Sequence, residues 1–432
     1  MYGLVDGKNF YASCHRIFQP DIEGRPIVVL SNRDGNIVSR SDEAKALGIK
    51  MGQLFFETRE LCQQHQISVF SSLYELYGDI SSRLMSCLTQ FAPDVEVYSI
   101  DEAFLFLDEQ FGLYQFGLYP SYQDLGQDIR RKIKQWLHIP VGVGIAPTKT
   151  LAKVANKLAK NRPELEGVCV LDSCESIAEA LESFPVEDLW GVGRKSAAKL
   201  RRQSIETAAQ LRDVNDDWIR QAMTVNGLRL VHELRGRPCK LLEVNPPAKK
   251  SICTEPGFGQ VIPDLEQIND ALTVHLFRVC EKLRRQHSLS GAVTVWLRTN
   301  PHRRTPGNGL PAKQYSNSLT VRLPHPTSST LEIIRYAESA LRAIFRTGYH
   351  YAKVGVMLTD LVDEDYRQGG LFTHGPDERF IHLSGVMDKV NKRYGHDTLR
   401  MASQLYNPDW PMKPRYLTPR FTTRWEEILE VK

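Results

Sequence analysis

The sequence predicts an α+β chain of several domains, and three observations support this fold class. Strand and helix patterns alternate over about the first 160 residues, which is typical of a sheet covered by helices. A proline-containing stretch at residues 235–248 then indicates a linker. Beyond it the patterns follow the order β-α-β-β-α-β. With 432 residues and 49.2 kDa, the chain is long enough for two to four domains.

The elements of the first part follow from the spacing of apolar residues. Short apolar runs predict strands at residues 2–5, 27–30, 95–98, 103–107 and 141–145. Apolar residues that recur every three or four positions predict helices at residues 9–18, 54–66, 73–91, 122–137 and 149–160. A short helix opens at Ser41 and ends at Gly48. The two strands that flank Asp101 and Glu102 indicate a β-hairpin.

The second part is expected to begin with short helices between residues 175 and 234, after a boundary at Pro163. Past the linker, the predicted elements are a strand near 251–258, a helix at 265–285, strands at 292–298 and 318–323, a helix at 331–346 and a strand at 353–358. This is a ferredoxin-like split unit. The remaining residues are polar and irregular, with one helical stretch near 385–393.

Composition excludes several classes of protein. Hydrophobic residues make up 42% and charged residues 25%, which argues against a disordered chain, a collagen-like chain and a coiled-coil rod. No stretch approaches the ~20 apolar residues of a membrane helix, and the start lacks the features of a secretory signal. We therefore expect a cytoplasmic protein without a membrane partner. The 8 cysteines form no CxxC pair, so neither a disulfide framework nor a zinc site is expected.

The positive charge is concentrated in one stretch. The net charge of the whole chain is +4, yet residues 235–350 contain 17 lysines and arginines against 8 acids. A basic stretch beside an acidic remainder indicates a polyanionic partner. A merely solvated surface is the alternative that charge alone leaves open.

Three acids stand at predicted strand ends. Asp6 closes the first strand, and Asp101 and Glu102 lie at the predicted hairpin turn. Acids gathered at one sheet edge are the oxygen ligands that Mg²⁺ prefers, and two such ions can clamp both oxygens of a phosphoryl transfer. Neighbours on a flat strand face opposite sides, so Asp101 and Glu102 can share a site only if the chain turns there. Solvated turn acids are the alternative.

The residues around these acids resemble a known family. Asp6-Gly7-Lys8-Asn9-Phe10-Tyr11-Ala12-Ser13 and Ser99-Ile100-Asp101-Glu102-Ala103-Phe104 are similar to the catalytic motifs of Y-family translesion DNA polymerases. The similarity is closest to the UmuC branch, which supplies the catalytic subunit of bacterial DNA polymerase V. It extends over residues 29–35, 43–48 and 142–153, and to residues 410–413 and 418–423 near the end of the chain.

The resemblance implies a right-hand polymerase with a ferredoxin-like palm. The implied domains are a palm at residues 1–18 and 73–162, small fingers at 19–72, a helical helix-hairpin-helix thumb at 163–234, a β-α-β-β-α-β little finger at 242–361 and a C-terminal tail at 362–432. The implied activity is error-prone, template-directed translesion synthesis in the SOS response, by two-metal nucleotidyl transfer without proofreading. A nucleotide cyclase, as another two-metal enzyme, or a catalytically silent DNA-binding scaffold at stalled forks remains as an alternative.

The resemblance also implies roles for residues of the active site. Asp6, Asp101 and Glu102 would bind two Mg²⁺ ions, assisted by the Gly7 carbonyl. Tyr11 matches the ring that excludes a ribose 2′-OH, and Phe10 packs beneath it. Ser39, Lys45 and Lys160 match contacts to the triphosphate of the incoming deoxynucleotide. Lys160 also suits a helix C-terminus, where the dipole favours a cation.

Three residues depart from the family pattern. Lys8 and Asn9 differ from the residues expected between Asp6 and Phe10. Asp42 stands where many members have a tyrosine that touches the triphosphate, and an acid is a poor phosphate ligand. No role is carried over to these three positions.

Further residues are expected to hold primer–template DNA. Gly191 and Gly193, followed by Lys195, resemble a helix-hairpin-helix that grips the DNA backbone without reading sequence, although Gly-x-Gly also suits a plain helix turn. In the little finger the expected phosphate contacts are Lys249, Lys250, Arg298, Arg303, Arg304, Lys313 and Arg322.

Two protein partners are also implied. Gln368, Leu371 and Phe372 resemble the Gln-x-x-Leu-Phe pattern that docks bacterial polymerases on the sliding clamp. A loop that packs Leu371 and Phe372 on its own domain is the alternative. The resemblance to the UmuC branch further implies a dimer of processed UmuD as a partner, without assigning residues to that contact.

Overall fold

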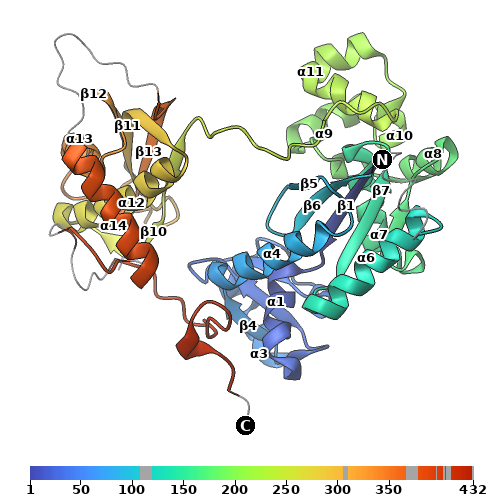
Figure 1. Ribbon diagram of the computed structural model, residues 1–432, viewed down its shortest axis with the longest axis horizontal. Coiled ribbons are helices and arrows are strands. Elements are labelled where there is room, and N and C mark those ends of the chain that lie inside the picture. The colour runs from blue at the N-terminus through green and yellow to red at the C-terminus, as the bar shows by residue number, and fades with distance from the viewer. Residues whose placement is uncertain are drawn as a thin grey trace. The chain divides into compact units, whose positions relative to one another are not determined.

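The computed structural model describes residues 1–107, 119–304, 310–365, 378–395, 397–401, 404 and 410–430 (Figure 1). Its contacts divide the chain into two units. Unit 1 contains Met1–Pro246 and Pro414–Lys432, and unit 2 contains Pro247–Lys413. Each unit has a hydrophobic core of its own.

The largest sheet of unit 1 has the strand order β5-β6-β1-β7-β8. Its central strand β1 is antiparallel to both neighbours, β6 and β7, whereas β8 is parallel to β7. The strands are β1 (Tyr2–Gly7), β5 (Val95–Val97), β6 (Glu102–Phe106), β7 (Val141–Ala146) and β8 (Val168–Val170). The predicted hairpin is present as β5 and β6, with Val97 opposite Ala103. Strand β8 was not predicted, and it extends the sheet beyond residue 162.

Helices cover both faces of this sheet, because side chains alternate along each strand. Val5, Leu105 and Val143 share a core with α1 (Phe10–Phe18), α4 (Tyr74–Leu88) and α6 (Tyr122–Leu137). Leu4 and Phe104 face the other way and pack with α7 (Lys149–Asn161). The even-numbered residues of β1 and β6, which include Asp6 and Glu102, therefore lie on the α7 face.

A smaller sheet lies between α1 and α4 in the sequence. Its strand order is β3-β2-β4, with β2 parallel to β4 and antiparallel to β3. The elements are β2 (Ile27–Leu30), β3 (Ile37–Arg40), α2 (Asp42–Ala46), α3 (Phe55–Gln64) and β4 (Ser68–Ser71). Strand β2 and both helices were predicted, whereas β3 and β4 were not.

Short helices follow β8, as predicted. They are α8 (Cys174–Glu182), α9 (Arg194–Arg201), α10 (Ala208–Arg212) and α11 (Asp216–Leu234), and their apolar residues join the core on the α7 face. The chain kinks within α11 at Met223 and Thr224, where Thr224 has φ 64°.

Unit 2 is built on one antiparallel sheet. Its strand order is β10-β13-β11-β12, and β9 also pairs with β13. The strands are β9 (Ile252–Thr254), β10 (Gly257–Ile262), β11 (Ser288–Thr299), β12 (Ser316–Thr327) and β13 (Tyr351–Asp363). With α12 (Leu265–Arg285) and α13 (Thr330–Ile344), they follow the predicted β-α-β-β-α-β order.

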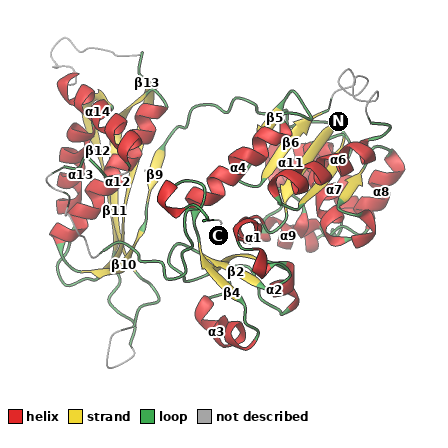
Figure 2. Cartoon of the chain, turned by 60° about the horizontal axis from the view of Figure 1, so that its bottom comes forward, coloured by secondary structure: helices red, strands yellow, loops and turns green. Residues whose placement is uncertain are grey.

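The helices of unit 2 cover one face of its sheet. Helices α12 and α13 lie along the sheet (Figure 2), and Val293, Val295 and Leu297 of β11 pack with them in a single core. The helix near the end of the chain, α14 (Glu378–Tyr394), begins earlier than predicted and packs on α13. Arg284 of α12 holds α14 through two bonds to the Asp388 carboxylate of 2.6 and 2.8 Å.

The predicted tail is divided between the two units. Trp410 is buried in unit 2, where its ring packs on Phe258 and His275. Phe421 is buried in unit 1, stacked on Phe18 at 4.7 Å between ring centroids. Among the described residues, no helix combines the length and the apolar character that crossing a membrane requires.

Candidate active site

The three predicted acids lie at one edge of the large sheet of unit 1. Asp6 and Glu102 are direct partners on the antiparallel strands β1 and β6, so their side chains share the α7 face. Asp101 precedes β6, and its carbonyl accepts a 2.8 Å hydrogen bond from the Gly7 amide. The sheet register therefore brings together residues that are about 95 positions apart in the sequence.

Ser99 determines how Asp101 and Glu102 are presented. Its hydroxyl donates to Asp101 Oδ1 at 2.7 Å and accepts the Glu102 amide at 3.1 Å. The Tyr98 and Ser99 amides both donate to the Glu102 carbonyl at 3.0 Å. Asp101 thus lies in a bend while Glu102 opens the strand, which removes the requirement that adjacent residues face opposite sides.

Each acid of the cross-strand pair has a lysine partner from α7. Lys160 forms an ion pair with Asp6, and Lys153 Nζ lies 3.0 and 3.1 Å from the two carboxylate oxygens of Glu102. Lys160 was predicted as a site residue, whereas Lys153 was not. Their helical spacing of seven places both on the same face of α7.

Close packing sets the position of α7. Asn156 donates to the carbonyls of Gly142 at 2.8 Å and Leu4 at 3.3 Å, on the two strands that α7 crosses. A Cβ at Gly144 would lie 2.2 Å from the backbone nitrogen of Asn156, so only glycine permits α7 to lie this close to β7. The two lysines are therefore held against the carboxylate edge by backbone packing.

The carboxylate edge carries unbalanced negative charge. Burial raises the pKa of Asp6 to about 7; the Lys160 ammonium opposes this rise, and the nearby carboxylates of Glu102 and Asp101 add to it. A site that raises the pKa of an acid by burial and repulsion is one that gains from a bound cation.

The donor set at this edge fits a hard divalent cation. Within the part of the chain that the structure describes, no three acid, histidine or cysteine side chains converge tightly enough to enclose an ion, since Asp6 and Glu102 turn to their lysines. The three carboxylates and the Gly7 carbonyl are nevertheless oxygen groups of the kind that Mg²⁺ prefers as ligands. The ammonium groups of Lys153 and Lys160 already lie beside two of these carboxylates.

The aromatic residues after Asp6 begin α1. Phe10 is buried, and a Cβ at Gly7 would lie 3.0 Å from its ring. Tyr11 is half-buried and stacks on Tyr77 with 4.2 Å between centroids and 10° between planes. The Tyr74 and Tyr11 rings meet edge to face, with 6.0 Å between their centroids. Asp101 is close enough to help raise the pKa of Tyr11, after burial and Tyr74, so the ring lies near the carboxylate edge.

The three residues that depart from the family pattern contact one another. Lys8 Nζ lies 2.7 Å from Asp42 Oδ2, and Asn9 Nδ2 donates to Asp42 Oδ1 at 3.0 Å. Lys45, a predicted triphosphate contact, also donates to Asp42 Oδ1 at 2.9 Å. This cluster was not predicted; the spacing of three between Asp42 and Lys45 on one helix is the sequence signal that could have found one of its contacts. Ser39, the other predicted contact of this region, is buried on β3.

The Gly-x-Gly turn precedes α9. Gly191 has φ 96°, a left-handed value that favours glycine, whereas Gly193 caps α9 at φ −83°. Lys195 is exposed in the first turn of the helix. The preceding Trp190 donates to the Tyr98 hydroxyl at 3.1 Å, which links this turn to the hairpin that carries Asp101 and Glu102.

The predicted cations of unit 2 fall into three groups. Lys249 and Lys250 are exposed ahead of β9, and the Lys249 backbone is held by the Gln286 side chain. Arg298 and Arg322 are exposed on β11 and β12. Arg303, Arg304 and Lys313 lie beyond the ends of these strands.

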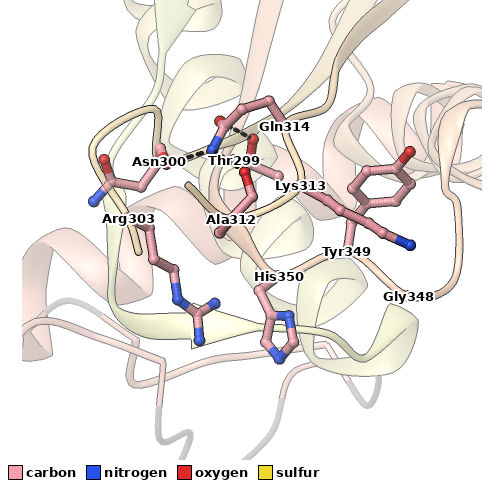
Figure 3. Close-up of a pocket in the computed structure, with 9 residues that line it drawn as sticks. All are labelled: Thr299, Asn300, Arg303, Ala312, Lys313, Gln314, Gly348, Tyr349 and His350. Atoms are coloured by element: carbon pink, nitrogen blue, oxygen red, sulfur yellow. Dashed lines mark hydrogen bonds between the residues drawn. The ribbon is translucent and has the colours of Figure 1, made fainter. Parts of the chain in front are cut away.

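Arg303 and Lys313 line a pocket of about 270 Å³ at that end of the sheet (Figure 3). Gln314 shapes it by donating to the Asn300 carbonyl at 3.1 Å and accepting from the Thr299 hydroxyl at 2.7 Å. His350 lines the same pocket, and its ring extends the same way as the Arg303 guanidinium (Figure 3).

The sheet face opposite α12 and α13 carries polar and cationic side chains. Arg298 pairs across the strands with Lys353, which was not predicted, and Glu255 lies 3.7 Å from Arg298 and 3.3 Å from Lys353. Trp296 lies across β13, since a Cβ at Gly355 would come within 2.2 Å of its ring. The alternation of polar and apolar residues along β11 is the signal that could have found this face.

The clamp-binding residues Gln368, Leu371 and Phe372 lie outside the described residues. Their prediction rests on the sequence pattern.

Comparison with known proteins identifies the family. Family models match residues 5–157 as the impB/mucB/samB family, residues 249–371 as the C-terminal domain of that family, and residues 382–431 as a domain of unknown function. The chain belongs to the impB/mucB/samB family.

Relatives in this family match over their full length. Protein UmuC of Salmonella typhimurium is 40% identical over 434 residues, which cover 100% of both chains. Protein MucB of Escherichia coli is 36% identical over 428 residues, or 99% of each chain. More distantly, DNA polymerase IV 1 of Bacillus subtilis is 25% identical over 418 residues, which cover 93% of this chain and 92% of that one.

Solved structures show the fold of this impB/mucB/samB member. A chimera of the Y-family DNA polymerases Dbh and Dpo4 matches with a TM-score of 0.66 at 21% identity, over 84% of this chain and 99% of that one. DinB from Sulfolobus solfataricus matches with a TM-score of 0.52 at 20% identity and the same coverage. The predicted resemblance to the UmuC branch and the predicted multidomain α+β polymerase fold are confirmed.

Proposed function

We propose that this protein is an error-prone, template-directed DNA polymerase that copies damaged templates in the SOS response, with Asp6, Asp101 and Glu102 as its metal ligands. Membership in a family with UmuC and MucB, together with the Y-family polymerase fold, supports the polymerase assignment. The observation that carries the site is the cross-strand pair of Asp6 and Glu102 beside the Asp101 bend.

Divalent metal use is typical of Y-family polymerases, and Mg²⁺ is the ion we propose here. Asp6, Asp101, Glu102 and the Gly7 carbonyl would hold two ions. When bound, Mg²⁺ activates the attacking hydroxyl and neutralises the departing pyrophosphate. The protein contributes the fixed carboxylate edge, because Ser99 holds Asp101 and the sheet register holds Asp6 opposite Glu102.

The incoming deoxynucleotide is proposed to bind between this edge and the small sheet. Tyr11, fixed by its stack on Tyr77 and supported by buried Phe10, would occupy the space that a ribose 2′-OH needs. Lys160 and Lys45 would contact the triphosphate, with Ser39 as a hydroxyl donor. The contact of Lys160 with Asp6 supports this role, since a phosphate beside the metal ligands lies within its reach.

DNA is proposed to bind through two surfaces that neutralise phosphates without reading bases. In unit 1 the Gly191–Gly193 turn with Lys195 would grip the backbone. In unit 2 the contacts would come from the exposed sheet face and the pocket at its end, which together contain Arg298, Arg303, Lys313 and Arg322. Arg304, Lys249 and Lys250 complete the proposed set.

Two protein partners are part of the proposal. The sliding clamp would bind the segment that contains Gln368, Leu371 and Phe372. A dimer of processed UmuD would bind a surface that we do not assign. The sequence pattern supports the first partner, and the relationship to UmuC supports the second.

Primer extension tests the proposal. The full chain is incubated with Mg²⁺, deoxynucleotides and a primer on an intact or an abasic template, and gel analysis measures the added nucleotides. Wild-type protein should extend both primers, whereas Asp101→Asn should extend neither while it still binds the primer–template. If Asp101→Asn extends primers at the wild-type rate, the assignment of Asp101 as a metal ligand is wrong. A wild-type protein that binds DNA but adds no nucleotide supports the scaffold alternative.

A further inference from the structure

The cluster around Asp42 joins two separate parts of unit 1. Lys8 and Asn9 lie between β1 and α1, whereas Asp42 and Lys45 lie on α2. One carboxylate accepts three donors: Lys8 Nζ at 2.7 Å, Asn9 Nδ2 at 3.0 Å and Lys45 Nζ at 2.9 Å. Lys45 Nζ also donates to Asn9 Oδ1 at 2.6 Å. Two ammonium groups and an amide therefore converge on one anionic group.

Stability does not account for this arrangement. The side chains of Lys8, Asp42 and Lys45 are 39%, 49% and 40% exposed, and exposed ion pairs contribute little to folding. Asn9 has a left-handed backbone with φ 53°, which is unfavourable for most residues. It precedes α1, yet its side chain makes no capping hydrogen bond to the helix and reaches Asp42 and Lys45 instead. The Asn9 side chain therefore serves the contact with α2 and not a cap of α1.

The donors suit a phosphate as well as a carboxylate. Ammonium groups and an amide N–H bind the oxygens of either anion, and a triphosphate carries several charges where the carboxylate carries one. Burial by itself would raise the pKa of Asp42, but its hydrogen bonds with Lys8, Asn9 and Lys45 hold that pKa well below its usual range. The Asp42 carboxylate therefore stays charged and keeps its donors at neutral pH.

We propose that Lys8, Asn9 and Lys45 bind the terminal phosphates of the incoming nucleotide, and that the Asp42 carboxylate occupies this site until the nucleotide displaces it. The assignment of Lys45 rests on the proposed function. Asp42 then acts as an internal competitor, which lowers the affinity for every nucleotide equally. Lys8 and Asn9, which depart from the family pattern, are new phosphate contacts that accompany it.

Binding of inorganic tripolyphosphate to the full chain tests this proposal without polymerisation. Calorimetry at about 0.05 M salt with EDTA measures the affinity where screening is weak and the metal site is empty of metal. Asp42→Asn keeps the side-chain shape and removes the charge, so it should bind about five- to tenfold more tightly. Lys8→Ala should bind about three- to tenfold more weakly. Asn9→Gly, which retains the left-handed backbone, should also weaken binding.

A matched control removes the neighbouring charge. Glu43 lies on the same helix, but its carboxylate pairs with Arg16 at 2.9 Å. Glu43→Gln should change tripolyphosphate affinity by less than about twofold, since the charge it removes lies outside the Asp42 cluster. A gain equal to that of Asp42→Asn would mean that general charge, and not competition at this site, controls binding.

Other results overturn the proposal directly. If Asp42→Asn binds as weakly as or more weakly than wild type, Asp42 positions the lysines or has no role. If Lys8→Ala and Asn9→Gly bind tripolyphosphate like wild type, the phosphate site lies elsewhere. If Asp42→Asn shows no binding at millimolar tripolyphosphate, the phosphate site also lies elsewhere. Primer extension with the same preparations separates the two proposals. If wild type extends primers but Asp42→Asn binds tripolyphosphate no more tightly than wild type, the competitor role of Asp42 is refuted and the polymerase function is not.

Discussion

Asp6 and Glu102 lie directly opposite each other on β1 and β6, and each carboxylate is paired with a different lysine of the same helix. The two lysines offset two of the three carboxylates, and the charge of Asp101 is left over. A metal ion bound by these oxygens would have to displace or share contacts with Lys153 and Lys160. In the proposed function, the two lysines would then be available to the phosphates of the nucleotide.

Neutralising either acid should abolish nucleotide addition. Asp6→Asn and Glu102→Gln should each slow primer extension by more than about a thousandfold, because metal assistance supplies several kcal/mol of the barrier reduction. DNA affinity, measured by fluorescence anisotropy, should change little because it rests on distant cations. Asp79→Asn removes a half-buried carboxylate that pairs with Arg83 away from the carboxylate edge, and it should extend primers normally. If Glu102→Gln extends primers at the wild-type rate, Glu102 is not a metal ligand.

Trimming Tyr11 should admit ribonucleotides. Tyr11→Ala deletes the ring that would collide with a 2′-OH, so discrimination against ribonucleotides should fall by at least about tenfold in single-nucleotide insertion. Tyr77→Phe is the control, because it keeps the stacked ring and removes the hydroxyl, with its 2.8 Å contact to His15. Unchanged selectivity in Tyr11→Ala would place the gate elsewhere, with Phe10 as the next residue to test.

Replacing the apolar pair of the clamp motif should abolish clamp stimulation. Full burial of Leu371 and Phe372 contributes roughly 1.5–3 kcal/mol for each side chain, and tethering to a clamp on DNA multiplies this effect. Leu371→Ala with Phe372→Ala should therefore lose clamp-dependent synthesis but keep basal extension of short primers. If the pair packs on its own domain instead, the double variant will melt at a lower temperature and a peptide of this segment will not bind the clamp.

Acid should destabilise the protein through two buried histidines. Burial lowers the pKa of His15 in unit 1 and of His275 in unit 2 to about 3, below the ordinary 6.5. The stability from each neutral ring is complete above pH 6.5 and is lost as the pH falls toward 3, because the unfolded chain binds the proton more tightly. At pH 5 the loss is about 2 kcal/mol per histidine.

Urea unfolding at pH 7.5 and pH 5 measures this loss. His15→Gln should reduce the difference between the two pH values, whereas His65→Gln, at an exposed position, should leave it unchanged. An unaltered pH dependence in His15→Gln would show that other groups cause the acid sensitivity.

Two tryptophans near the end of the chain should respond differently to truncation. Trp410 is buried, packs on Phe258 and His275, and donates to the Asp270 carboxylate. Trp410→Ala should lower the unfolding free energy of unit 2 by about 3–5 kcal/mol. Trp425 is 87% exposed, and Trp425→Ala should change it by less than about 0.5 kcal/mol. Equal effects in urea unfolding would contradict the proposed difference.

The sequence predicted the parts of the site that depend on local patterns. An acid pair between two apolar strands indicated the hairpin. The structure adds the bend at Asp101, which lets both acids lie at one edge of the sheet. Lys153 could not be found, because its contact with Glu102 spans 51 positions and depends on how α7 crosses the sheet. The Asp42 cluster was missed for the same reason, since its contacts span 33 positions or more to Lys8 and Asn9.

The fold was predictable where elements are long. Helices α6 and α12 begin and end at the predicted residues because their apolar stripes run for several turns. Strands β3, β4 and β8 contain only three or four residues each. The equally short β2 is wholly apolar and was predicted, whereas polar residues interrupt the apolar pattern of β3 and β4. Pairing with neighbours distant in the sequence, not local preference, makes them strands.

The stack of Phe421 on Phe18 has a consequence for how the protein is made. A ribosome synthesises Phe18 early and Phe421 much later, with the whole of unit 2 between them. At the usual rates of translation, the core around Phe18 waits on the order of 10–35 seconds after residue 246 for its last aromatic partner. A nascent chain interrupted before that point exposes an apolar surface that the finished protein hides, and chaperones are expected to hold it during this interval.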